Sequence, residues 1–100
     1  MPVTYTLDDG VMLNREFPAT FLIPPEDERI GLSTGDFVKL IFRIETDDDT
    51  AVERMWVKVT EVRASGYLGI LDNDALCTEA IRSGMQIEFH ADHVIQIYRD

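Results

Sequence analysis

The sequence predicts an α+β fold made mainly of antiparallel β-strands, arranged as a curved sheet or a partly open SH3-like barrel, with one short helix before the last two strands. Three observations predict it. Isoleucine and valine together outnumber leucine, which favours strands over helices. Two long segments alternate apolar and polar residues with a period of two. Glycines and acidic residues stand between the alternating segments, where turns are expected.

The length and charge of the chain limit its organisation and its partners. One hundred residues suit one domain, so we expect residues 1–100 to form a single β-rich domain in which residues 1–34 are a covering segment. A net charge of -10 argues against general binding to nucleic acid or anionic membranes. One cysteine allows no internal disulfide. Short apolar stretches and a start without signal-peptide features predict a cytoplasmic protein.

The first third of the chain predicts one strand and one helical turn. Residues 3–6 suit a strand. Residues 24–29 predict a single helical turn, with Pro25 at its first position and acidic side chains at the positive end of the helix dipole. The apolar residues between them show no clean period: Val11, Met12, Leu13, Phe17, Phe21, Leu22 and Ile23. We expect this segment to cover the sheet built by the rest of the chain.

Two alternating segments predict a central hairpin. One face of residues 37–45 carries only apolar side chains, from Val38, Leu40, Phe42 and Ile44. Residues 51–62 repeat the pattern with Met55, Val57 and Val59. The phase slips at residues 61–62, which indicates a β-bulge or the end of the strand. The acidic run at residues 47–49 is interpreted as a solvated turn, so the two strands are expected to pair antiparallel.

A short strand and a helix are predicted next. Residues 67–71 follow a turn signal and suit a strand. Residues 75–82 are favourable for a helix, because Asp74 is suited to cap its first N–H groups and Gly84 to follow its end. This is the one short helix expected before the last two strands.

The chain is expected to end in two strands, residues 86–89 and 93–98, around a tight turn at residues 91–92. Gly35 and Gly84 both follow a small residue and precede an alternating strand. We interpret this similarity as shared turn chemistry, in which glycine supplies a backbone angle that other residues disfavour.

The C-terminal turn carries the only residues that suggest a catalytic or metal site. His90 and His93 flank this turn, but zinc needs at least three protein ligands in a catalytic site and four in a structural one. Asp92 or Cys77 could supply a further ligand only if the fold brings them together, and Cys77 could also act as a nucleophile with one histidine as its base. The alternative is a solvated polar turn and a cysteine that serves as a small buried apolar residue. No catalytic residue, metal or cofactor is assigned.

The central hairpin offers a more informative surface. On the face opposite its apolar side chains it carries four of the nine basic residues, Lys39, Arg43, Arg54 and Lys58. Trp56 and Phe37 share this face, which we call the basic-aromatic face. Because tryptophan and arginine are enriched at binding hot spots, the face is suited to a small anionic ligand or to an acidic segment of a protein partner, with Trp56 as the anchor.

Two structural interpretations of the basic-aromatic face stand beside the binding one. In the first, Glu45 and Glu53 are simple cross-strand partners of its cations, in surface pairs that contribute little stability. In the second, Phe17 and Phe21 pack over Trp56 and turn the face into a second core layer.

Several stretches together resemble an uncharacterised bacterial family, the YegJ-like domain of unknown function. They are GDFVKL at 35–40, ERMWVKV at 53–59, GILDND at 69–74, and the similar ending IEF at 87–89 with HVI at 93–95. The chain has Ala75 where the family tends to have proline, and nothing matches before residues 17–18. The resemblance implies a small soluble β-rich domain and brings no activity. It singles out four positions for testing: Arg54, Trp56, Asp72 and Asn73.

The sequence thus predicts a non-catalytic binding or partner-regulating module of unknown biological role. Its candidate binding residues are Lys39, Arg43, Arg54, Trp56, Lys58, Asp72 and Asn73. A runner-up is an inhibitor or immunity-type protein whose negative charge speeds encounter with a basic partner. Two competing hypotheses are a small enzyme with a site at His90 or His93, and an assembly domain that pairs as a homodimer through an exposed strand instead of remaining a monomer.

Overall fold

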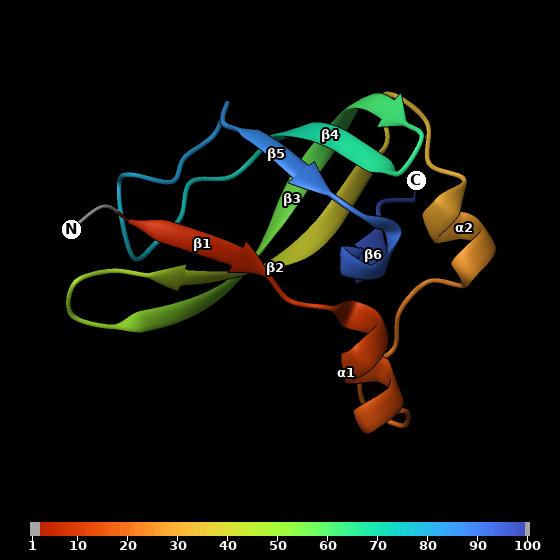
Figure 1. The fold of residues 1–100 in the computed structure, drawn as a ribbon, viewed down its shortest axis with the longest axis horizontal. Helices are drawn as coiled ribbons and strands as arrows, with labels where there is room; N and C mark the ends of the chain where they lie inside the picture. The colour runs from red at the N-terminus through yellow and green to blue at the C-terminus, as the bar shows by residue number, and fades with distance from the viewer. Residues whose placement is uncertain (1–2, 100) are drawn as a thin grey trace.

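The computed structural model describes residues 3–99, which form a six-stranded sheet curled into a partly open barrel (Figure 1). Its strands are β1 (Thr4–Leu7), β2 (Phe37–Glu45), β3 (Thr50–Arg63), β4 (Gly66–Leu71), β5 (Gln86–Phe89) and β6 (Gln96–Ile97). Neighbours follow chain order from β1 to β5, β6 pairs with β2, and every pair is antiparallel. The predicted fold class is confirmed.

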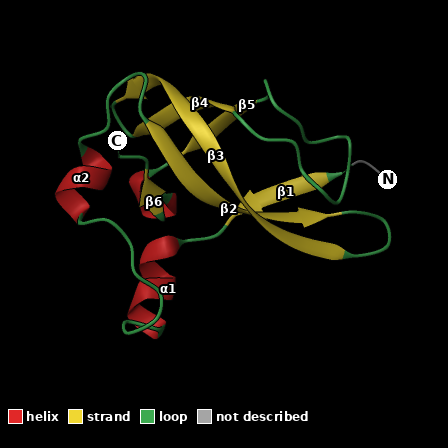
Figure 2. Cartoon of the chain, turned by 180° about the vertical axis from the view of Figure 1, so that it is seen from behind, coloured by secondary structure: helices red, strands yellow, loops and turns green. Residues whose placement is uncertain are grey.

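The core lies inside the curl of the sheet. The apolar face predicted for β2 is fully buried, and the predicted face of β3 is buried with it. Leu71, Ile87 and Phe89 complete this core from β4 and β5. Figure 2 shows the long β2–β3 hairpin bending across the molecule, so that one end of the sheet turns towards the other. The predicted alternation and hairpin are therefore confirmed.

An irregularity in β3 bends its pairing with β4. The register shifts between Val59 and Glu61, so Thr60 is the extra residue, one position before the predicted phase slip. Such a bulge increases local twist, which helps an open sheet to curl. Before β2 and β5, Gly35 and Gly84 adopt φ angles of 99° and 98°. Both angles are disfavoured for other residues, which confirms the predicted role of glycine in these turns.

Two short helices lie beside the sheet. The predicted turn is α2 (Glu26–Ile30), with Pro25 at its N-cap instead of its first helical position. The helix α1 (Gly10–Glu16) was not predicted, because its apolar residues follow no clear period. Asp9 caps it by accepting a hydrogen bond from the Met12 N–H at 3.0 Å. Both helices pack against η1 (Ala91–His93), a 3₁₀ turn, on the side of the molecule that holds β6 (Figures 1 and 2).

The helix predicted at residues 75–82 is wrong, because this segment forms a loop of turns. Asp74 accepts a hydrogen bond from the Ser83 N–H at 2.9 Å, so its carboxylate closes the loop instead of capping a helix. The Ala75 N–H donates to the Ile81 carbonyl at 3.0 Å. Leu76, expected on a packed helix face, is 95% exposed. An eight-residue helix is marginal by itself, so these tertiary hydrogen bonds outweigh local helix propensity.

The C-terminal strand is shorter than predicted and has a different partner. Residues 91–93 form η1, and β6 spans only two residues. β6 pairs with β2 instead of the preceding strand, and the Tyr98 N–H extends this pairing by donating to the Phe37 carbonyl at 2.9 Å. The expectation of two strands around a tight turn is therefore wrong in its pairing. Among the described residues, no helix has the length and apolar character needed to cross a membrane.

Candidate functional site

The pairing of β2 with β3 places each of two lysines over an aromatic ring. Lys39 stands opposite Trp56 in the register, and Lys58 opposite Phe37. The Lys39 Nζ lies 4.8 Å from the centre of the Trp56 ring, and the Lys58 Nζ 6.0 Å from that of Phe37. Both distances allow a cation–π interaction, which orders the lysine chain without neutralising its charge. At these four residues, the structure therefore has the basic and aromatic side chains side by side, as the strand alternation predicts.

Tyr98 adds a third aromatic ring that sequence reasoning missed. Its ring meets Trp56 edge-on, with centroids 6.1 Å apart and planes at 85°. The backbone hydrogen bond to Phe37 holds Tyr98 beside β2, although the residue is 57% exposed. Because Tyr98 directly follows buried Ile97, strand alternation places its side chain on the exposed face. Its position beside Trp56 depends on the pairing of β6 with β2, which the sequence did not reveal.

Phe37, Trp56, Tyr98 and Asp72 line a cleft of about 270 Å³, which we call the aromatic cleft. Sites for drug-sized molecules usually occupy about 300 to 1,000 Å³, so this cleft is small for a cofactor. Three aromatic side chains give it an apolar surface, while Lys39 and Lys58 stand over two of these rings. Chemically, the arrangement suits one apolar side chain with acidic neighbours.

Asp72 and Asn73 hold the backbone of Trp56 in place. The Asn73 Oδ1 accepts a hydrogen bond from the Trp56 N–H at 2.6 Å, and the Asp72 N–H donates to the Trp56 carbonyl at 2.9 Å. These bonds continue the β3–β4 pairing beyond the end of β4, where it stops at Val57 and Leu71. The Asn73 side chain is thus a positioning group, whereas Asp72 contributes an exposed side chain to the cleft lining.

The two predicted arginines are engaged by the N-terminal segment. Arg43 makes two hydrogen bonds to the Asp8 carboxylate, at 3.0 and 2.8 Å, and this pairing raises the pKa of the Arg43 guanidinium. The Arg54 guanidinium lies 5.5 Å from the centre of the Phe21 ring. The structure therefore places Trp56 in the cleft lining, sets Lys39 and Lys58 over the rings of Trp56 and Phe37, and gives both arginines other partners.

The two structural interpretations of the face are met only in part. Phe21 does pack on the hairpin, but against Arg54, and Phe17 is 49% exposed. The Glu53 carboxylate accepts hydrogen bonds from the N–H groups of Leu76 and Cys77, at 2.8 and 3.0 Å. Burial alone would raise the pKa of Glu53, but these hydrogen bonds outweigh it and lower the pKa. Glu53 thus fastens a loop to the edge of β3.

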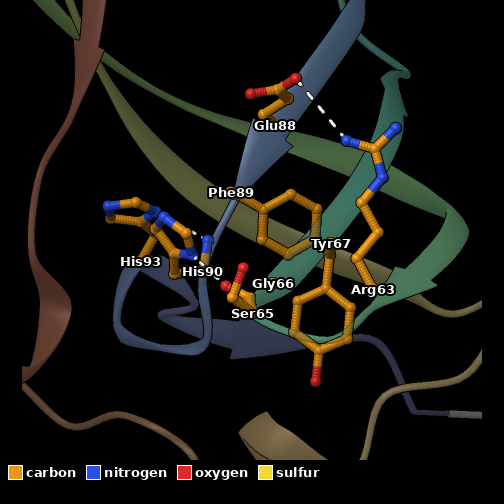
Figure 3. Close-up of a pocket in the computed structure, with 8 residues that line it drawn as sticks. All are labelled: Arg63, Ser65, Gly66, Tyr67, Glu88, Phe89, His90 and His93. Atoms are coloured by element: carbon orange, nitrogen blue, oxygen red, sulfur yellow. Dashed lines mark hydrogen bonds and ion pairs between the residues drawn. The ribbon is translucent and has the colours of Figure 1, made fainter.

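The two C-terminal histidines line a separate pocket of about 230 Å³ (Figure 3). Their ring centres are 5.4 Å apart. The His93 Nδ1 accepts the His90 N–H at 3.0 Å, and the His90 Nδ1 lies 2.8 Å from the Ser65 carbonyl, a distance at which a protonated Nδ1 donates. Burial, and then the neighbouring His90, lower the pKa of His93. Each histidine therefore uses one ring nitrogen to hold the backbone.

Cys77 does not join these histidines in the pocket lining. It is exposed on the loop after β4, so the interpretation of a buried apolar cysteine is wrong. Desolvation and the adjacent Glu53 raise the pKa of its thiol, which disfavours the nucleophilic thiolate. Within residues 3–99, no three histidine, cysteine or acidic side chains are grouped to hold a metal ion.

Comparison with known proteins gives a family and no activity. The family model described as "Uncharacterized protein conserved in bacteria (DUF2314)" matches residues 21–97. The match confirms the expected membership of an uncharacterised bacterial family and begins well before residue 35, while the YegJ-like label stays a prediction. No curated protein matches the chain, and no solved structure matches it.

Proposed function

We propose that this chain, which belongs to the DUF2314 family of uncharacterised bacterial proteins, is a non-catalytic protein-binding module whose aromatic cleft takes up an acidic segment of a partner. The observation that carries the proposal is Lys39 standing over Trp56 beside a cleft lined by three aromatic rings. An apolar side chain of the partner would enter the cleft, and its acidic neighbours would meet Lys39 and Lys58.

The charge distribution supports an acidic ligand. The chain carries nineteen acidic and nine basic residues, so its charge is negative overall. The two lysines on the aromatic surface make the local charge positive there. Among the described residues, Lys39 and Lys58 have no carboxylate within ion-pair distance, unlike Arg43 and Arg63. Charges farther away than about 10 Å are largely screened at 0.1 M salt, so a bound segment responds mainly to these two lysines.

The geometry also supports binding without large rearrangement. Lys39 and Trp56 are already in contact in the free protein, and the Trp56 backbone is fixed by Asp72 and Asn73. Ordering side chains before binding reduces the entropy lost on association. Asp72 places one carboxylate in the lining, which disfavours an acid at that point and so orients the bound segment.

A peptide titration tests the proposal, because Trp56 is the only tryptophan and reports on the cleft alone. Three short peptides serve as probes. The first has a central phenylalanine flanked by glutamates, the second has lysines in place of those glutamates, and the third keeps the glutamates but has alanine in place of the phenylalanine. We expect saturable change in Trp56 emission with the first peptide only. Lys39→Gln and Lys58→Gln should each weaken binding about two- to fivefold, as expected for exposed charge pairs.

Matched variants separate the cleft from general electrostatics. Arg82→Gln removes the same charge from an exposed loop residue that neither lines the cleft nor stands over one of its rings, and it should leave affinity unchanged. Asp72→Asn should strengthen binding of the acidic peptide. Equal affinity of Lys39→Gln, Lys58→Gln and Arg82→Gln would contradict the proposed site. Binding of free dicarboxylates as tight as that of the peptide would instead indicate a small-anion site.

A further inference from the structure

We propose a second interaction surface at the seam of the barrel, where β1 and β5 face each other: the seam accepts an extended segment of a partner protein that pairs with both strands and closes the barrel. The seam is a cleft of about 530 Å³ lined by Tyr5, Thr6, Leu7, Gln86, Glu88 and His93. All of these residues except His93, which belongs to η1, come from β1 and β5, the two ends of the strand order (Figure 1).

The register shows which backbone groups of β1 point into the seam. The Asp8 N–H donates to the Ile41 carbonyl at 3.0 Å, so Asp8 occupies a hydrogen-bonded position against β2. In an antiparallel pair such positions alternate, and the residues between them direct their N–H and C=O groups away from the partner. Tyr5 and Leu7 are these residues, and both line the seam.

The same reasoning identifies the free groups of β5. The Leu71 N–H donates to the Met85 carbonyl at 2.8 Å, which fixes the hydrogen-bonded positions against β4. Gln86 and Glu88 therefore direct their N–H and C=O groups away from β4, and both line the seam. The next N–H in this series belongs to His90 and is taken up by the His93 ring. The free edge of β5 therefore ends at Glu88, because the His90 N–H already has the His93 ring as its acceptor.

Strand direction determines what fits between the two edges. Because β1 to β5 are successively antiparallel, β1 and β5 run parallel to each other, and their arrows point the same way in Figure 1. One strand placed between them is antiparallel to both and completes an alternating barrel. β1 and β5 have four residues each, so the inserted segment needs about four or five extended residues.

The side chains beside the seam define the chemistry of the segment. Tyr5 and Leu7 pack towards the core, with the Tyr5 ring 5.3 Å from that of Phe42, so inward residues of the segment should be apolar. The outward side is polar. The Glu88 side chain is 81% exposed there, and its carboxylate lies 3.7 Å from a guanidinium nitrogen of Arg63, an exposed pair of the kind that contributes little. A basic residue opposite Glu88 would share this carboxylate with Arg63. Every strand within residues 3–99 is already paired, so a second copy would have to give up a strand of its own.

Amide hydrogen exchange tests the seam directly. In the free protein, the amides of Tyr5, Leu7, Gln86 and Glu88 should exchange at least about tenfold faster than those of Thr6 and Ile87, which bond within the sheet. The probe is a short peptide that alternates valine with lysine and threonine. Its binding should slow exchange of the four seam amides, and N-methylation of its valines should weaken binding about tenfold or more.

Charge and self-association controls complete the test. Glu88→Lys should lower the affinity for the basic peptide severalfold, whereas Glu79→Lys, on an exposed loop outside the seam lining, should leave that affinity unchanged. Unchanged exchange of the seam amides at saturating peptide would overturn the proposal, as would equal binding of the N-methylated peptide. Protection that rises with concentration of the protein alone would assign the seam to a second copy and also overturn it.

Discussion

Arg29 shows how much of the N-terminal packing depends on one residue. It is a buried charged residue that contacts three segments, two through its side chain and the third through its backbone carbonyl. Its Nε donates to the Pro24 carbonyl at 2.9 Å and an Nη to the Ala91 carbonyl at 3.2 Å, with the Asp92 carboxylate 3.7 Å away. The Tyr67 hydroxyl donates to the Arg29 carbonyl at 2.9 Å. Nothing in the sequence pattern distinguishes this arginine from a surface residue at a helix end.

Arg29→Ala should lower the free energy of unfolding by about 3 kcal/mol, because the partly buried carbonyls of Pro24 and Ala91 lose their donor and a cavity remains. Urea unfolding measures the loss. Arg15→Ala, at an exposed position in the last turn of α1, is the matched control and should stay within about 0.5 kcal/mol of the wild type. Similar losses in the two variants would show that Arg29 does not join the segments.

His93 should make stability sensitive to mild acid. Burial first, and then His90, lower the pKa of its imidazole, although Asp9 and Asp92 act in the opposite direction. A base with a lowered folded-state pKa contributes full stability above its unfolded value of 6.5 and loses it as the pH falls through the lower folded value. Protonation of Nδ1 also removes the acceptor for the His90 N–H.

His93→Asn should therefore lose less stability than the wild type between about pH 8 and pH 5, because its amide oxygen can accept the same N–H without titrating. Thermal unfolding of both proteins at the two pH values provides the comparison. A parallel fall in stability would mean that other groups cause the acid sensitivity.

At the scale of elements, Glu53 holds in place the loop that the structure has where the sequence predicts a helix. Its carboxylate binds two N–H groups of the loop after β4. Although burial opposes the shift, these bonds lower the pKa of Glu53 below the ordinary 4.5, so their stabilisation is present above that value and is lost as the pH falls through the lower folded pKa.

Glu53→Gln keeps one acceptor and removes the charge. We expect it to lower the free energy of unfolding at neutral pH by about 1 kcal/mol, the difference between a charged and a neutral acceptor. The difference from the wild type should disappear in acid, which a series of urea unfolding curves can follow. A loss that persists unchanged in acid would show that the carboxylate charge is not involved.

The strands could be predicted because burial imposes a period that the sequence displays. β2 has the predicted bounds, and β3 extends the predicted segment by one residue at each end. The errors lie where long-range hydrogen bonds decide the structure, in the loop fastened by Glu53 and in β6, which pairs with a strand far away in sequence. α1 escaped prediction because a seven-residue helix with an exposed Met12 has little apolar periodicity.

At the scale of the whole molecule, the basic-aromatic face has two parts. Its lysines stand over the aromatic rings of the hairpin, and its arginines contact the N-terminal segment. Alternation placed Lys39, Lys58 and Trp56 on one side of the hairpin, as the structure confirms. It could not show that Tyr98 completes the cleft or that Asp8 takes up Arg43, because both depend on how the chain ends return to β2. Local strand phase was visible in the sequence, whereas closure of the barrel was not.

Quenching of Trp56 emission tests the central claim, that a cationic, open aromatic cleft exists on an acidic protein. A chain with net charge -10 repels iodide and attracts caesium over most of its surface. Lys39 beside the half-buried Trp56 should reverse this order locally, so iodide should quench more than caesium, and Lys39→Gln should reduce that difference. Stronger quenching by caesium, or blue-shifted emission that neither ion quenches, would contradict the account.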